Sequence, residues 1–179
     1  GDLAEKYGLK VHLDGARLFN AAVALDIDVE VLTKRVDSVM FCLSKGLSAP
    51  VGSIVCGERG FIHRARKFRK MVGGGMRQAG HLAAAGLVAL ESLTERLKDD
   101  HLHAKFLAKQ LASFEGIELD QNSVKTNIIF FKLNHPRIDQ DQFLRTLEAN
   151  SIKILMTDPG IFRAVLHREI TREQVEVVA

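Results

Sequence analysis

Residues 38–57 read SVMFCLSKGLSAPVGSIVCG, and this stretch decides the fold that we expect. Ser38–Leu43 is a continuous apolar run, which is typical of a short strand buried on both faces of a sheet. Ser53–Cys56 is a second such run between two glycines, and it follows too closely for a crossover helix. Because parallel neighbours need a connection of about a dozen or more residues, we predict that the second strand runs antiparallel to the first.

The residues before this stretch predict a βαβ unit. Lys10–Leu13 is a short strand, Leu18–Leu25 an apolar helix, and Asp28 a helix cap for Val29–Arg35. A crossover of this kind makes the strands on either side of it parallel, so their carboxyl ends meet at one edge of the sheet. Ligands of open α/β sheets bind at that edge.

The second half of the chain has a different pattern. Helices are expected over Glu58–Lys70, Met76–Leu97 and Leu102–Ser113, with a break at the two aspartates between the last two. Short strands and helices then alternate to the end of the chain, which suggests a small α+β domain. We therefore expect an α/β fold with a mixed, mostly parallel sheet over residues 1–97 and a small C-terminal α+β domain over residues 98–179.

Composition places the chain among ordinary globular proteins, with 46% hydrophobic and 26% charged residues. The 25 basic and 22 acidic residues are scattered and leave a net charge of only +3. The basic run His63–Lys70 is interpreted as a solvated helix face, so no nucleic-acid partner is expected. Neither a membrane-spanning run nor a signal peptide is apparent, which predicts a cytoplasmic protein without a membrane partner. Cys42 and Cys56 are expected to be buried free thiols, and no metal site is indicated.

Two residues at the expected strand ends can carry chemistry. Lys45 is either an ordinary surface lysine or an amine that is partly desolvated at the mouth of the strand, which would lower its pKa toward a nucleophile. Asp14 is either a turn residue or a carboxylate that pairs with a protonated pyridine nitrogen. Arg17 could bind a carboxylate or a phosphate through its planar fork. His12 is expected to pack or to form a hydrogen bond rather than to catalyse.

Three sequence motifs, taken together in their order along the chain, are specific enough to indicate a family. They are HLDGARLFNAAVAL (12–25), SVMFCLSKGLSAPVGSIVCG (38–57) and MVGGGMRQAG (71–80). Together they resemble the threonine aldolase branch of the β-eliminating lyase family, which has the aspartate aminotransferase fold. The resemblance continues through RAVLHREIT (163–171) near the end of the chain. It implies that residues 1–97 are the C-terminal part of the large cofactor-binding domain of a fold-type-I pyridoxal-phosphate enzyme.

The resemblance also implies a role for each site residue. Lys45 would carry pyridoxal 5'-phosphate as a covalent aldimine, and Asp14 would hold its ring nitrogen. Arg17 would contact the substrate carboxylate next to the cofactor, and Arg163 would be a second arginine for that carboxylate. Arg77 would approach the cofactor phosphate of a neighbouring subunit.

The reaction implied is the cleavage of L-threonine or L-allo-threonine to glycine and acetaldehyde, in a homodimer or homotetramer. Another β-eliminating lyase or an aminotransferase remains open, because Asp14 and Lys45 would serve each of them. The family's chains are about twice as long and place the phosphate-binding turn in the N-terminal half, so we expect a fragment, a truncated isoform or a degenerate product. The alternative from another class is a non-catalytic partner of a full-length aldolase.

Overall fold

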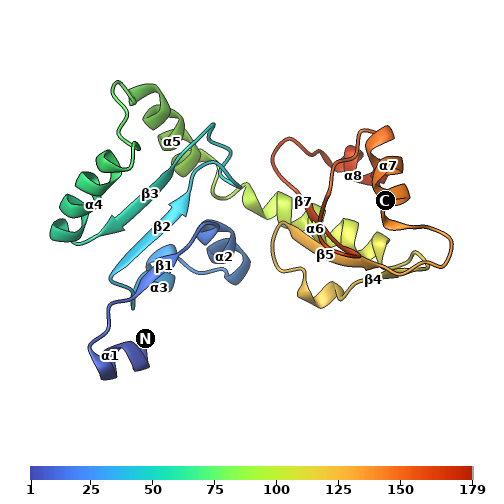
Figure 1. Cartoon of the computed structure of the whole chain (residues 1–179), viewed down its shortest axis with the longest axis horizontal. Coiled ribbons are helices and arrows are strands. Elements are labelled where there is room, and N and C mark those ends of the chain that lie inside the picture. The colour runs from blue at the N-terminus through green and yellow to red at the C-terminus, as the bar shows by residue number, and fades with distance from the viewer. Residues whose placement is uncertain (179) are drawn as a thin grey trace. The chain divides into compact units, whose positions relative to one another are not determined.

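The computed structural model describes residues 1–178, and the chain forms two compact units, Gly1–Arg96 and Leu97–Ala179. Each unit has a sheet of its own (Figure 1). No helix within residues 1–178 has the combination of length and apolarity that is needed to cross a bilayer.

The first unit is a three-stranded sheet in the order β1-β2-β3 with five helices around it. Its elements are α1 (Asp2–Tyr7), β1 (His12–Asp14), α2 (Leu18–Leu25), α3 (Val29–Thr33), β2 (Ser38–Cys42), β3 (Ser53–Gly57), α4 (Arg59–Met71) and α5 (Gly80–Ser92). β1 and β2 are parallel, and β3 is antiparallel to β2. The predicted βαβ unit and the predicted antiparallel strand are both confirmed.

Packing of α2 against β2 explains why the apolar runs form these elements. Leu18 and Ala22 of α2 are buried, as are Val39 and Phe41 of β2. Phe19 of α2 meets the ring of Phe41 edge to face, with 5.2 Å between ring centroids. This geometry is the favoured one for aromatic pairs, because the positive edge of one ring faces the negative face of the other.

The outer strand β3 differs from expectation, because all five of its residues are exposed. Cys56 is therefore an exposed free thiol, whereas Cys42 on β2 is half-buried. The expectation of two buried thiols is wrong for Cys56. An apolar run indicates a strand, but its burial depends on what packs against it, and β3 is an edge strand of this sheet.

The second unit is a four-stranded antiparallel sheet in the order β4-β5-β7-β6. Its elements are α6 (Leu97–Leu111), β4 (Ile117–Glu118), the 3-10 helix η1 (Gln121–Ser123), β5 (Ile128–Leu133), α7 (Gln140–Ala149), β6 (Leu155–Asp158), β7 (Ile161–Val165) and α8 (Arg172–Val178). Burial alternates along β7, where Phe162 and Ala164 are buried. Such alternation is typical of a sheet with one face on a core.

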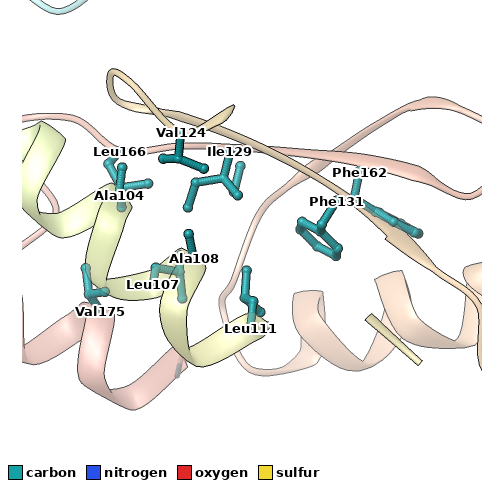
Figure 2. Close-up of a cluster of buried hydrophobic side chains, with 11 residues drawn as sticks. Ala104, Leu107, Ala108, Leu111, Val124, Ile129, Phe131, Phe162, Leu166 and Val175 are labelled. Atoms are coloured by element: carbon teal, nitrogen blue, oxygen red, sulfur yellow. The ribbon is translucent and has the colours of Figure 1, made fainter. Parts of the chain in front are cut away.

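The core of this unit lies between the helix α6 and the sheet (Figure 2). Phe162 is fully buried and stacks on Phe131, with ring centroids 5.4 Å apart. Phe143 of α7 adds an edge-to-face contact with Phe162 at 5.2 Å. Removing an aromatic ring of this kind from water contributes about 2–3 kcal/mol, and Phe131 and Phe162 are both buried in this core.

The predicted helix break at Asp99 and Asp100 is wrong. Both aspartates lie in the first turn of α6, and the chain leaves the helical conformation earlier, over residues 93–96. Acidic side chains are favoured in a first helical turn because the N-terminal end of the helix dipole is positive. The same pair of residues is therefore a start signal here rather than a stop signal.

Candidate active site

Asp14 is the last residue of β1 and lies opposite Met40 of β2 in the parallel register. Its side chain is exposed, and its Oδ1 accepts a hydrogen bond of 3.2 Å from the backbone N–H of Ala16. Carboxylates that bond to a backbone N–H two residues on are typical of turns. Here the turn also places the Asp14 side chain at the C-terminal end of β1.

Gly15 allows this strand end to approach β2. Its N–H donates to the carbonyl of Met40 at 2.9 Å. A Cβ atom at this position would lie 3.0 Å from that carbonyl oxygen and 3.2 Å from Cβ of Leu18. Glycine is therefore favoured here by the close backbone approach, and its φ is not in the left-handed region.

Arg17 follows at the N-cap of α2 and is half-buried. The carbonyl of Ala16, just before it, accepts a hydrogen bond of 3.3 Å from the N–H of Cys42. The loop that leads from Asp14 to Arg17 is thus bonded to the last residue of β2. Asp14 and Lys45, which follows β2 by three residues, are presented at the same edge of the sheet.

Lys45 lies in a compact turn between β2 and β3. Its carbonyl accepts the N–H of Ser48 at 2.9 Å, and the N–H of Ala49 returns to the carbonyl of Leu43 at 3.0 Å. Leu47 is only 2% exposed, so it anchors the turn in the interior. The Lys45 side chain is exposed, so of the two interpretations of Lys45 the described residues 1–178 match the surface lysine and do not supply the partial desolvation.

At the other end of these strands, just before β1 and β2 begin, a lysine and an aspartate form an ion pair. Nζ of Lys10 lies 2.7 Å from Oδ1 of Asp37, and Oδ2 of Asp37 accepts the N–H of Val11 at 2.8 Å. The hydrogen bond to Lys10 and then the one from Val11 lower the pKa of Asp37, and the same carboxylate raises the pKa of Lys10. His12 bonds through Nδ1 to Oγ of Ser38 at 2.8 Å. The expectation that His12 forms a hydrogen bond is confirmed.

The remaining two predicted site residues lie apart in the chain. Arg77 is exposed in the loop between α4 and α5, next to Gln78, whose φ is 47°. Arg163 is in the middle of β7, opposite Phe130 and Leu155. It is half-buried, and its Nε is buried without a hydrogen-bond partner among the described residues. A buried N–H donor of this kind needs an acceptor.

Sequence reasoning missed one feature of the site, the backbone of Ser48. Its φ is 60°, in the left-handed region that a non-glycine residue adopts only in special turns. No signal in the sequence marks it, because serine has no strong preference for this region. Within residues 1–178 no group of three or more histidine, cysteine or acidic side chains is arranged to hold a metal ion.

The fold and the strand-end residues define a class of protein, and solved structures confirm the fold. Threonine aldolase from Leishmania major aligns with 98% of this chain and 52% of its own, with a TM-score of 0.73 at 20% identity. A structure of SPT with a PLP internal aldimine aligns with 99% of this chain and 47% of its own, with a TM-score of 0.71 at 21% identity. The expected fold of fold-type-I pyridoxal-phosphate enzymes is thereby confirmed.

Residues 1–134 match the family described as beta-eliminating lyase, and the chain belongs to this family. Low-specificity L-threonine aldolase 1 of Arabidopsis thaliana is 44% identical over 98% of this chain and 49% of its own length. The low specificity L-threonine aldolase of Escherichia coli K12 is 38% identical over 99% of this chain and 51% of its own. The chain spans about half the length of the curated relatives it matches.

Proposed function

We propose that the protein is a pyridoxal-phosphate-dependent aldehyde-lyase. It cleaves β-hydroxy-α-amino acids, with L-threonine and L-allo-threonine giving glycine and acetaldehyde. The observation that carries this proposal is the placement of Asp14 and Lys45 at one edge of a parallel strand pair, at the ends of β1 and β2. The threonine aldolases that are 44% and 38% identical to the chain support the choice of reaction.

The residues at this edge fit the cofactor. Lys45 offers an exposed primary amine, which is the group that condenses with an aldehyde. Asp14 offers an exposed carboxylate whose Oδ1 accepts a local hydrogen bond from the N–H of Ala16. A carboxylate here would keep a proton on the pyridine nitrogen by pairing with it. When bound, pyridoxal phosphate supplies a ring that takes up the electron pair released at the α-carbon of the substrate.

Arginines are proposed to orient the substrate and the cofactor. We assign Arg17 and Arg163 to the substrate carboxylate, because a guanidinium group binds carboxylates through two parallel hydrogen bonds. The buried Nε of Arg163, which lacks a partner in the described chain, supports this role. Arg17 would also lie next to the cofactor, and Arg77 would contact the cofactor phosphate of a neighbouring subunit. Holding the carboxylate selects which bond at the α-carbon breaks.

The domain division and the assembly belong to the same proposal. Residues 1–97 would be the C-terminal part of the large cofactor-binding domain, and residues 98–179 the small C-terminal domain. The protein would form a homodimer or a homotetramer with full-length chains. Exposed apolar side chains on and after α4 support assembly: Phe68, Met71, Val72 and Met76 are 58–82% exposed. Apolar clusters of this kind mark interaction surfaces.

The test uses pyridoxal phosphate and a matched pair of lysine variants. The purified protein is titrated with cofactor, reduced with borohydride and digested, and the labelled residue is mapped. We expect the label on Lys45, its loss in Lys45→Gln, and no change in Lys34→Gln, an exposed lysine at the end of α3. Acetaldehyde released from L-allo-threonine then identifies the reaction, whereas amino transfer to a keto acid would contradict it.

A second candidate function is that of a non-catalytic partner subunit. The exposed outer strand β3, with Ile54 and Val55 on it, favours association with another chain. This candidate predicts no borohydride label on Lys45 at saturating cofactor, together with co-elution with a full-length family member in size-exclusion chromatography. A label on the chain by itself would reject it.

A further inference from the structure

We propose that Ser48 is a positioning residue for Lys45: its left-handed backbone holds the turn that presents the lysine. This inference rests on the proposed function, because it concerns the amine that would bind the cofactor. In this proposal Ser48 has no chemical role of its own. It acts through the backbone of residues 43–49.

The turn is closed by hydrogen bonds to both sides of Ser48. The N–H of Ser48 donates to the carbonyl of Lys45 at 2.9 Å, and the next N–H, of Ala49, donates to the carbonyl of Leu43 at 3.0 Å. The N–H of Leu43 in turn donates to Gly52 at 2.9 Å. The chain must reverse between the first two bonds, and the φ of 60° at Ser48 makes that reversal.

The neighbours of Ser48 leave it little freedom to relax. Leu47 is 2% exposed and Ala49 is 8% exposed, so both flanking side chains are in the interior. The Ser48 hydroxyl also donates to the carbonyl of Gly46 at 3.3 Å. A shift of the Ser48 backbone would pull Leu47 or Ala49 out of its site, or break the bond to Lys45.

Lys45 depends on this backbone because its side chain is exposed. Packing of its stem does not set its place, so the location of its Cα atom is decided by the turn. Reacting groups must be held in a narrow range of positions, and small displacements from remote changes lower rates strongly. Backbone strain at such a place is a common feature of functional sites.

Four variants test the proposal. Ser48→Gly removes the strain and the hydroxyl together, while glycine adopts the left-handed region freely. Ser48→Val and the milder Ser48→Thr add a β-branch, which is strongly disfavoured there. Ser53→Val is the matched control, because Ser53 is exposed on β3 in extended backbone, where β-branched residues are favoured.

Two measurements are made on each variant. The first is the rate at which pyridoxal phosphate becomes covalently attached to Lys45, followed by borohydride trapping and mapping. The second is amide hydrogen exchange at residues 48 and 49 without cofactor, which reports the turn alone. Thermal unfolding checks that each variant is folded, and Ser48→Thr takes the place of Ser48→Val if the valine variant does not fold.

We expect Ser48→Val to attach cofactor on the order of tenfold to a hundredfold more slowly and to exchange both amides faster. Ser48→Gly and Ser53→Val should match the unaltered protein in both measurements. The proposal is overturned if Ser48→Val or its threonine substitute behaves like Ser53→Val. It is also overturned if Ser48→Gly is as slow as Ser48→Val, because the hydroxyl and not the backbone would then hold the turn. No attachment to Lys45 in the unaltered protein would reject the proposed function instead, and amide exchange would still decide the role of Ser48.

Discussion

The backbone N–H of Cys42 donates a hydrogen bond of 3.3 Å to the carbonyl of Ala16. Through this bond, the loop after Asp14 is joined to the strand that leads to Lys45. A second bond, of 2.9 Å from Gly15 to Met40, lies next to it along the same strand pair. The relative position of the two proposed catalytic residues is therefore set by backbone bonds between adjacent strand ends, which are less mobile than side-chain contacts.

Gly15→Ala should destabilise the first unit and displace Asp14. The added Cβ would lie 3.0 Å from the Met40 carbonyl oxygen, which is backbone and cannot rotate away. Overpacking of this kind costs about 1–3 kcal/mol in the free energy of unfolding, measured by chemical denaturation. Gly80→Ala is the control: nothing lies within 4 Å of its added Cβ, and alanine is the better helix former at the start of α5. Equal stability of the two variants would contradict the close approach.

Asp14→Asn should preserve the fold but lower the proposed activity. Asparagine keeps an oxygen that can accept the N–H of Ala16, so the local turn survives. It has no negative charge to pair with a protonated ring nitrogen, and we expect kcat for L-allo-threonine cleavage to fall on the order of a hundredfold. Asp28→Asn, at the exposed N-cap of α3, should leave kcat unchanged. An unaltered rate in Asp14→Asn would remove Asp14 from the site.

Phe162→Ala should destabilise the second unit more than any surface change. Phe162 is fully buried and contacts the rings of Phe131 and Phe143. Truncation of such a ring costs about 3–5 kcal/mol, because a cavity remains where the ring was. Phe130→Ala on β5 is the matched control, since Phe130 is 51% exposed. Thermal unfolding followed by calorimetry would show the difference, and similar losses in both variants would contradict the described core.

Asp37→Asn should weaken the acid sensitivity of unfolding. Hydrogen bonds from Lys10 and Val11 hold the pKa of Asp37 below its ordinary value of 3.8. A carboxylate of this kind contributes stability that is present above pH 3.8 and is lost as pH falls through its lowered folded pKa. The side chains of Lys10 and Asp37 are both exposed, so the contribution of their ion pair to stability should be small and should decrease further in high salt. Unfolding midpoints from pH about 6 to about 2.5 measure it, and an unchanged slope in the variant would contradict the pairing.

Several elements could be read from the sequence because their signals are local. The helix Leu18–Leu25 and the strand pairing of Ser38–Cys42 follow from runs of apolar residues and from the length of the loop between strands. Gly8 ends α1 in the left-handed conformation, with φ of 61°, as a glycine after a helix commonly does. Asp139 caps α7 by accepting the N–H of Gln142 at 2.9 Å.

Other elements could not be predicted, because their residues are compatible with more than one local structure or form too short a pattern. Asp99 and Asp100 predict either a helix break or a helix start, and only the packing of Leu97, Ala104 and Leu107 selects the start. The two-residue strand β4 has no pattern of its own, since two residues are too few for a period. Cys56, like Cys42, belongs to an apolar run, but it lies on an edge strand, so its exposure depends on the sheet.

The sequence by itself determined the family and the identity of Asp14 and Lys45 as the residues to examine, because both depend on residue types in a fixed order. The tertiary structure alone decided how Lys45 is held. The approach of Gly15 to Met40 joins two separate strand ends, and the left-handed backbone of Ser48 and the burial of Leu47 belong to the folded turn between β2 and β3. Serine has no strong local preference for positive φ, so the folded turn had to impose it.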